Sequence, residues 1–210
     1  MEQGRNSIFF CFLTVPFLSA ILFAEGVKQM KKEKIAVFCG SRMGSHPVYR
    51  EAALETGLAL AKSGRTLLFG GCDYGLMQVV SHAAHDHGGR VLSFRIQGLT
   101  DAYAPEIIAA DEQLEHVQAR KRRLIEAADA CIALPGGLGT LDEMGDVYSM
   151  SQLGDLRRPL GILNVNGYFD GFLQFVDTIH REGFLSDRDK GLIIVRQDIH
   201  ALLDALDAAE

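Results

Sequence analysis

The segment that most constrains the fold of this chain is a short apolar run that leads through a glycine turn into a helix. Residues 130–134 (Ala-Cys-Ile-Ala-Leu) have the length and continuous hydrophobicity of a strand buried on both faces, as in a parallel sheet. The turn 135–139 (Pro-Gly-Gly-Leu-Gly) follows, and apolar residues then recur at helical spacing over 144–152. In an open α/β sheet, ligands bind where a turn ends such a strand. The segment therefore predicts a ligand site.

The composition of this turn favours a monophosphate ligand. Gly136, Gly137 and Gly139 let the backbone approach a ligand closely, and the free N–H groups of the following helix favour an anion. No lysine follows the last glycine, as a nucleoside-triphosphate loop requires, and the third glycine of the dinucleotide fingerprint is absent. We expect these three glycines and Thr140 to hold a phosphate through backbone donors.

Glu143 admits two interpretations. It follows Thr140 by three residues, which fits a capping box in which both side chains satisfy free N–H groups at the start of the helix. Alternatively, its carboxylate lies one turn into the helix, just beyond the anion site, where it is a poor phosphate ligand and needs another role. In that second interpretation Glu143 is catalytic. The spacing alone leaves both interpretations open.

The same residues carry a family resemblance. Residues 135–143 match in full the PGGxGTxxE motif of the LOG family, often described as lysine decarboxylase-like, and the resemblance extends from about residue 35 to about residue 206. It implies a Rossmann-like fold and the activity of a cytokinin riboside 5′-monophosphate phosphoribohydrolase. It also implies a homodimer in which a helix of the partner completes the site.

Two further turns follow predicted strands at 34–39 and 66–69. The carboxyl ends of parallel strands meet at one edge of the sheet, so these turns are expected to face the same crevice as the first. We therefore expect Ser41, Gly70 and Gly71 to contact the substrate, although for Ser41 an ordinary turn approaching a helix is an equal alternative.

Both turns resemble segments of the LOG family. The first is similar to its Cys-Gly-Ser stretch, and the second to its GGGxxGLMG motif. In the second, Cys72 replaces the third glycine and Gln78 the fourth. These departures concern how closely the base or the sugar approaches this part of the backbone.

A basic helix is predicted to begin near residue 118. Arg120 and Lys121 align with the Arg-Lys of the family motif MHxRK, in which Val117 and Gln118 replace the Met and His. Near Glu143, Arg120 would orient that carboxylate and keep it ionised. Lys121 is expected to add to the positive field around the phosphate.

The alternation of strands and helices along the chain predicts one doubly wound parallel sheet with helices on both faces. A helix is expected to begin at Pro47 and to place five apolar residues on its inner side: Val48, Ala52, Leu54, Leu58 and Ala61. The other expected elements are strands at 90–96, 114–117, 158–164 and 192–195 and helices at 169–180 and 199–206, with a loop at 97–110. Phe172, Phe175, Val176 and Ile179 form the apolar side of the helix at 169–180.

The first 29 residues are interpreted as lying outside the fold. Residues 8–24 are almost wholly apolar, which suits a signal peptide or a membrane anchor. Pro16 interrupts the run, however, and its cleavage site is poor. We favour Met30 as the true initiator, so that residues 30–210 form a single Rossmann-like hydrolase domain and residues 1–29 an apolar extension.

Charge and cysteine usage exclude several classes of protein. A formal net charge of −6 argues against a nucleic-acid binder, which usually shows a basic face. The four cysteines have no C-x-x-C spacing and indicate neither a zinc site nor a disulfide framework. Cys39 and Cys131 lie in apolar runs and are interpreted as small buried hydrophobes. This cysteine usage suits a reducing cytoplasm. We also expect no membrane contact for the folded domain.

The histidines at 82–87 give a weak metal signal. His82 and His85 could share a helix face and bind a metal with Asp86 or His87. Nothing fixes a third ligand at helical spacing, so we favour the polar end of a helix, with Gly88 in its C-terminal cap. We expect neither a metal nor a cofactor.

Together, the residues and the resemblance predict hydrolysis of the N-glycosidic bond of a nucleoside 5′-monophosphate, with an N6-substituted adenine as the base. Glu143 would stabilise an oxocarbenium-like state or activate water. Three alternatives remain open: a decarboxylase, although no pyridoxal-phosphate lysine context is recognisable; a non-catalytic nucleotide-binding module; and an N-glycosidase acting on another nucleotide, such as AMP or CMP.

Overall fold

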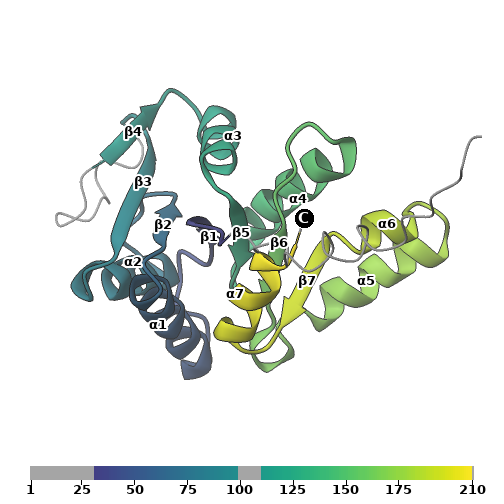
Figure 1. The fold of residues 1–210 in the computed structure, drawn as a ribbon, viewed down its shortest axis with the longest axis horizontal. Coiled ribbons are helices and arrows are strands. Elements are labelled where there is room, and N and C mark those ends of the chain that lie inside the picture. The colour runs from purple at the N-terminus through teal and green to yellow at the C-terminus, as the bar shows by residue number, and fades with distance from the viewer. Residues whose placement is uncertain (1–30, 99–109, 210) are drawn as a thin grey trace, which may run out of the picture.

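The computed structural model describes residues 31–98 and 110–209, and in this part of the chain seven parallel strands form one sheet (Figure 1). The strands are β1 (Lys34–Phe38), β2 (Thr66–Phe69), β3 (Arg90–Ile96), β4 (Ala110–Leu114), β5 (Ala130–Ala133), β6 (Leu160–Leu163) and β7 (Ile193–Arg196). The helices are α1 (Pro47–Lys62), α2 (Gly75–Asp86), α3 (Val117–Ala127), α4 (Leu138–Leu153), η2 (Val165–Gly167), α5 (Asp170–Arg181), α6 (Asp187–Lys190) and α7 (Ile199–Asp207). The predicted doubly wound parallel sheet is confirmed. The interpretation of residues 1–29, and most of the expected loop at 97–110, lie outside the described residues.

The strand order creates a crevice at the centre of the sheet. The order is β4-β3-β2-β1-β5-β6-β7, so the chain moves outward from β1 to β4 and then returns to the other side of β1 as β5. Helix α1 follows β1 on one face of the sheet, and α4 follows β5 on the opposite face. The two connections therefore diverge where β1 and β5 end, which is the switch point at which such sheets bind ligands.

The central strands β1, β2, β5 and β6 are mostly buried on both faces, and their alternate side chains enter two separate cores. Ile35 and Val37 of β1 pack with residues of α1, α2 and α7, whereas Ala36 and Phe38 pack with residues of α3, α4 and α5. This explains the continuous apolar runs of the sequence. In α7 the four apolar residues at helical spacing are all buried: Ile199, Leu202, Leu203 and Leu206.

The predicted inner side of α1 is partly wrong. Leu54 is 37% exposed, and the buried residues of the helix centre on Ala53 and Gly57 instead. A Cβ at Gly57 would lie 2.5 Å from the Val80 carbonyl oxygen and 2.7 Å from the Ala83 Cβ of α2. The close approach of α1 and α2 thus requires small side chains at the contact. Helical periodicity of large apolar residues cannot reveal a contact made by glycine and alanine.

Two other predictions are partly wrong, one in the position of a strand and one in the burial of a helix. The short strand expected at 114–117 is β4 at Ala110–Leu114, and Val117 is already the first residue of α3. In α5 the expected apolar side is only partly covered, because Val176 is buried whereas Phe175 is 61% exposed. Burial in α5 therefore does not follow its strong amphipathic pattern.

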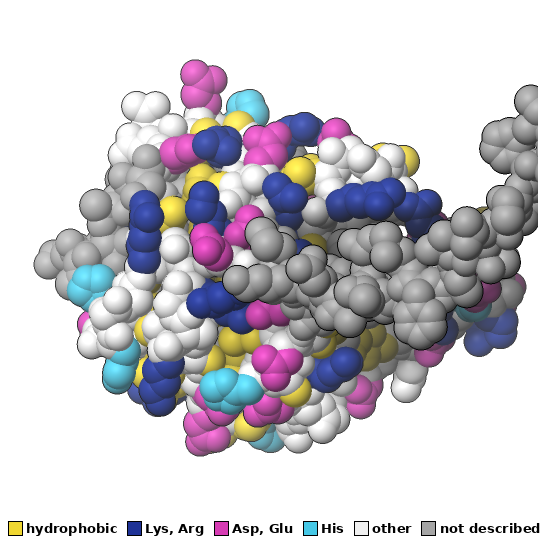
Figure 2. Space-filling view, viewed as in Figure 1, with side chains coloured by type: hydrophobic (Ala, Val, Ile, Leu, Met, Phe, Trp, Pro, Cys, Tyr) yellow, Lys and Arg dark blue, Asp and Glu magenta, His cyan; other side chains and the backbone are white. Residues whose placement is uncertain are grey.

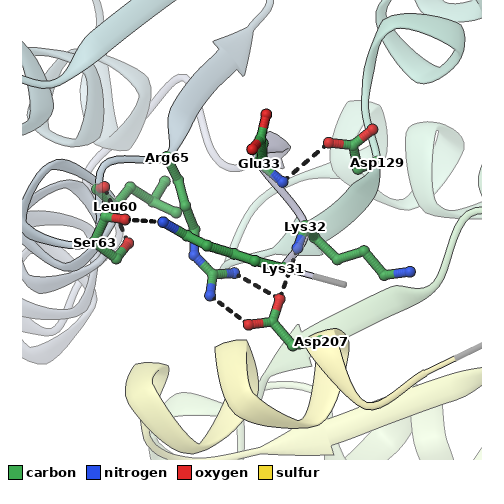
Figure 3. A network of polar contacts seen from close by, with 8 residues as sticks. All are labelled: Lys31, Lys32, Glu33, Leu60, Ser63, Arg65, Asp129 and Asp207. Atoms are coloured by element: carbon green, nitrogen blue, oxygen red, sulfur yellow. Dashed lines mark hydrogen bonds and ion pairs between the residues drawn. The ribbon is translucent and has the colours of Figure 1, made fainter. Parts of the chain in front are cut away.

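Polar contacts fix the amino-terminal end of β1 to distant parts of the chain (Figure 3). The Asp129 carboxylate accepts from the Lys34 N–H at 2.9 Å, and the Asp207 carboxylate accepts from the Lys32 N–H at 2.8 Å. Arg65, only 6% exposed, forms two further bonds to Asp207, at 2.7 and 3.2 Å. The bonds to Asp207 join α7 to the segment before β1, at the end of the sheet opposite the crevice.

The visible surface carries interspersed charges. Basic and acidic side chains both lie over the face seen in Figure 2, where the coloured atoms show the described residues. Among the described helices, none is long and apolar enough to cross a bilayer.

Candidate active site

A cavity of about 860 Å³ lies at the crevice between the ends of β1 and β5. The turn after β1, the turn after β5 and the start of α4 form its walls, together with side chains of α2, α3 and the segment after β6. Seven of the ten predicted site residues line it: Ser41, Arg120, Gly136, Gly137, Gly139, Thr140 and Glu143. Gly70, Gly71 and Lys121 do not.

The turn after β5 is held close to the turn after β1. The Gly40 N–H donates to the Pro135 carbonyl oxygen at 3.0 Å. A Cβ at Gly136 would lie 2.1 Å from the Thr140 Oγ1 and 2.9 Å from the Gly40 nitrogen, so only glycine fits there. At Gly137 and Gly139 a Cβ would meet nothing within 4 Å. Those two positions leave open space at the start of α4, as a backbone site for a ligand requires.

The capping-box interpretation of Thr140 and Glu143 is wrong. Helix α4 begins at Leu138 with Gly137 as its N-cap, and no side chain caps it. Thr140 is therefore the third residue of the helix and is 4% exposed, with its hydroxyl against Gly136. No side chain of residues 31–98 or 110–209 caps the first N–H groups of α4, which leaves these groups available to an anion.

Glu143 instead forms an ion pair with Arg120 of α3. Arg120 Nη2 lies 3.2 Å from Glu143 Oε1, and each side chain is 14% exposed. Arg120 Nη1 donates to the Gly70 carbonyl oxygen at 3.4 Å. A Cβ at Gly70 would lie 2.1 Å from that same nitrogen, so glycine is needed there to admit the guanidinium. Gly70 thus supports the site by positioning Arg120 and does not itself line the cavity.

Burial sets the protonation of Glu143. It raises the pKa of this carboxyl from 4.5 to about 7, against the opposing effect of the Arg120 guanidinium. We predicted that Arg120 keeps Glu143 ionised, and it does favour the ionised form, but burial outweighs it. Both protonation states are therefore populated near neutral pH, as suits a group that takes part in proton transfer.

Lys121 points away from the cavity. Its Nζ lies 2.8 Å from carboxylate oxygens of Asp142 and of Asp146, and the side chain is 2% exposed. Burial alone would lower the pKa of Lys121, but these two carboxylates more than offset it and raise the pKa. These ion pairs of Lys121 join α3 to α4, the two helices that carry Arg120 and Glu143.

Gly71 is required by the conformation of the backbone after β2. Its φ of +76° is a conformation that side chains rarely adopt, and a Cβ there would lie 2.7 Å from Arg95 Cγ. Cys72, which stands where the family motif has a glycine, is half-buried and lines the cavity.

Sequence reasoning missed the aromatic wall of the cavity. Tyr168, just after η2, lines it and donates from its hydroxyl to the Gly136 carbonyl oxygen. The Tyr168 ring packs edge-on against Tyr49 of α1, with 5.4 Å between centroids. The Asn166-Gly167 pair, both at positive φ, turns the chain before Tyr168. That Asn-Gly pair was the available signal, because it marks a turn two residues after the end of β6.

The histidines form no metal site among the described residues, where no group of three or more potential metal ligands occurs. His82 lies 2.9 Å from Asp73, and His87 contacts the Ala83 carbonyl oxygen at 2.9 Å. The C-cap of α2 is His87, and Gly88, predicted as the C-cap, follows it with φ +75°. Cys39 and Cys131 are buried, and burial raises the pKa of both thiols.

Comparisons with known proteins identify the family. A family model described as "Possible lysine decarboxylase" matches residues 77–206. The cytokinin riboside 5′-monophosphate phosphoribohydrolase LOG of Oryza sativa subsp. japonica is 38% identical over 170 residues, covering 80% of this chain and 70% of that protein. LOG7 of Arabidopsis thaliana, with the same activity in its name, is 39% identical over 180 residues, covering 85% and 82%.

The chain belongs to the LOG family. The resemblance found in the PGGxGTxxE motif is therefore confirmed, and Arg120 and Glu143, which the LOG motifs contain, meet in one cavity. Of the two residues that depart from the family's MHxRK motif, Val117 lines the cavity, whereas Gln118 does not.

Solved structures support the fold. The molybdenum cofactor carrier protein of Chlamydomonas reinhardtii matches with a TM-score of 0.65 and 19% identity, covering 84% of this chain and 97% of that one. The molybdenum cofactor binding protein of Rippkaea orientalis matches with a TM-score of 0.62 and 20% identity, covering 85% and 98%. At such identities the likeness concerns the architecture alone.

Proposed function

We propose that this LOG-family chain hydrolyses the N-glycosidic bond of nucleoside 5′-monophosphates, releasing a free base and ribose 5-phosphate. The observation that carries the proposal is the Arg120–Glu143 ion pair, which faces the same cavity as the first turn of α4. An anion site and a buried carboxylate in one cavity suit a substrate that has a phosphate at one end of a ribose and the scissile bond at the other.

The phosphate is proposed to bind at the first turn of α4. Helix α4 is 16 residues long, so its dipole is fully developed, and its first N–H groups have no side-chain cap. Gly137 and Gly139 offer these groups without a side chain in the way. The 5′-phosphate would fix the ribose so that C1′ comes within reach of Glu143.

Glu143 is proposed to act on the reacting carbon. As the bond from C1′ to the base nitrogen breaks, its electron pair leaves with the base and positive charge develops on the sugar. An ionised Glu143 stabilises that charge, or it takes a proton from the water that attacks C1′. Arg120 holds the carboxylate in place in either role.

The base is proposed to occupy the part of the cavity furthest from the start of α4. Apolar side chains of α2, β3 and α3 line the cavity and would contact the base: Leu76, Met77, Ile96 and Val117. The names of the curated relatives favour an N6-substituted adenine. An apolar wall would also accept the base of AMP or CMP, and these remain the alternative substrates.

A decarboxylase is not supported by the residues of the site. Among the described residues that line the cavity there is no lysine. The aldehyde of pyridoxal phosphate needs a lysine amine. Lys121, the lysine that the motif brings nearest, is held by Asp142 and Asp146.

Product analysis tests the proposal. Purified protein is incubated with N6-isopentenyl-AMP, AMP, CMP and adenosine, beside a Glu143→Gln variant that keeps the size of the side chain. We expect free base and ribose 5-phosphate from at least one nucleotide, a loss of about 10²- to 10⁴-fold in Glu143→Gln, and little turnover of adenosine. Nucleotide binding without any release of base would leave only the binding module.

We also propose that the chain is a cytoplasmic homodimer. Leu138 and Leu153, at the two ends of α4, are 84% and 82% exposed, which favours their burial by a second copy. Cys39, Cys72 and Cys131 are free thiols, in keeping with a reducing compartment. Light scattering at several protein concentrations tests the dimer, and a monomer at all of them would refute it.

A further inference from the structure

A second cavity lies at the end of the sheet where the strands begin, whereas the active-site cavity lies where they end. It measures about 300 Å³ and is formed where β6 and β7 begin, between the end of α4 and α6. Three arginines line it: Arg157, Arg158 and Arg188. In Figure 2, dark-blue basic side chains gather in the region where Figure 1 places α6. No aspartate or glutamate is among its lining residues in the described part of the chain.

The acidic side chains near these arginines have other partners. Asp155 and Glu126 both pair with Arg122, at 3.3 and 2.8 Å. On α6, Asp187 pairs with His180 at 2.8 Å, and Asp189 accepts from the Gln152 amide at 3.2 Å. Within the described residues, none of the three cavity arginines forms an ion pair.

Arg158 is fixed in place without being neutralised. Its two terminal nitrogens donate to the backbone carbonyl oxygens of Arg157 and Glu126, at 3.2 and 3.3 Å. These carbonyl groups accept from the two terminal nitrogens but carry no net charge, and the buried Arg158 Nε has no hydrogen-bond partner among the described residues. The turn that holds Arg157 and Arg158 is itself anchored, because the Ser151 hydroxyl bonds to the Leu156 and Arg158 carbonyl oxygens. The positive charge of Arg158 therefore has a fixed position in the wall of the cavity.

We propose that this cavity binds a small phosphate-bearing anion at a site separate from the active site. Guanidinium groups match the oxygens of a phosphate in paired hydrogen bonds, and like charges gathered at a concave surface attract an anion. Pro159, Leu192 and Ile194 give the same cavity an apolar wall. Its volume corresponds to about ten water molecules, which suits a phosphate with a small organic group or a second phosphate.

Calorimetric titration with inorganic pyrophosphate in 150 mM KCl tests the site in the full chain. The test variant is Arg157→Ala with Arg188→Ala, and both side chains are exposed, so the fold is expected to persist. The matched control is Arg50→Ala with Arg181→Ala, which removes the same charge from exposed positions elsewhere. Melting temperature and circular dichroism verify that each protein is folded.

We expect the test variant to weaken pyrophosphate binding at this site at least tenfold and the control variant to leave it unchanged. An Arg120→Ala variant, altered in the active site, should keep this binding, which separates the site from the active-site cavity. Three results would overturn the proposal: no pyrophosphate binding to the wild type, equal weakening by both double variants, or loss of all binding in Arg120→Ala. None of these outcomes depends on whether the chain is a glycosidase.

Discussion

Glu143→Gln is predicted to gain stability relative to the wild type as the pH rises from 5 to 8. The wild-type carboxyl has a pKa of about 7 in the folded chain and about 4.5 when unfolded. Between these values the folded state binds more protons than the unfolded state, so the free energy of unfolding falls as the pH rises. The amide of glutamine does not titrate, and its variant escapes this loss.

The magnitude follows from the two pKa values. The difference between 4.5 and 7 corresponds to about 3 kcal/mol in all, at about 1.4 kcal/mol for each tenfold change in proton affinity. Most of it, about 2–3 kcal/mol, is lost between pH 5 and pH 8. Glu143→Gln also leaves Arg120 without its carboxylate, which lowers stability at every pH. That contribution largely cancels when the same pair of proteins is compared at two pH values.

Urea denaturation at pH 5, 6, 7 and 8 measures the effect. The chain has no tryptophan, so helix content followed by circular dichroism is the suitable signal. The free energy of unfolding of the variant minus that of the wild type should rise by about 2–3 kcal/mol from pH 5 to pH 8. A constant difference would mean that the pKa of Glu143 is ordinary. A fall would mean that Arg120 outweighs burial, and either result refutes our account of the site.

Three further predictions follow from the contacts of the cavity. Tyr168→Phe removes the hydroxyl that holds the Gly136 carbonyl, so KM for AMP should rise about fivefold, the equivalent of about 1 kcal/mol, with no change in the dissociation constant of adenosine; an equal rise in that constant would contradict this role. Gly136→Ala, whose Cβ would meet Thr140 at 2.1 Å, should abolish measurable AMP turnover, whereas Gly145→Ala in open space within α4 should retain it and gain about 0.5–1 kcal/mol in urea denaturation. Lys121→Met should leave KM for AMP within twofold, because the ammonium of Lys121 is held by two carboxylates of α4. A tenfold rise in KM would instead support the predicted contact between Lys121 and the phosphate.

The sequence predicted the sheet because its strands are local patterns. Buried parallel strands read as short continuous apolar runs, and β2 and β3 have the predicted bounds. The weaker signal was β4 (Ala110–Leu114), whose sequence Ala-Asp-Glu-Gln-Leu is mainly polar at the edge of the sheet. Its position depends on pairing with β3 and not on its own hydrophobicity.

The different positions of Arg120 and Lys121 could be assigned only from the tertiary structure. Neighbouring residues of a helix point about 100° apart, so one faces the cavity and the other faces α4. Which one does so depends on how α3 is rotated against the sheet. The sequence predicted that both contact the substrate, whereas in the structure Arg120 lines the cavity and Lys121 is paired with Asp142.

By itself, then, the sequence determined the strand–turn–helix units, the glycine turns at the strand ends and the family motif, because each depends on residues close together in the chain. Only the tertiary structure decided the features made by distant segments. These are the contact of Arg120 with Glu143 across 23 positions, the hold of Tyr168 on the Gly136 carbonyl and the gathering of three arginines at the far edge of the sheet. The pKa of Glu143 belongs with them, because burial is a property of the packed molecule and not of any one segment.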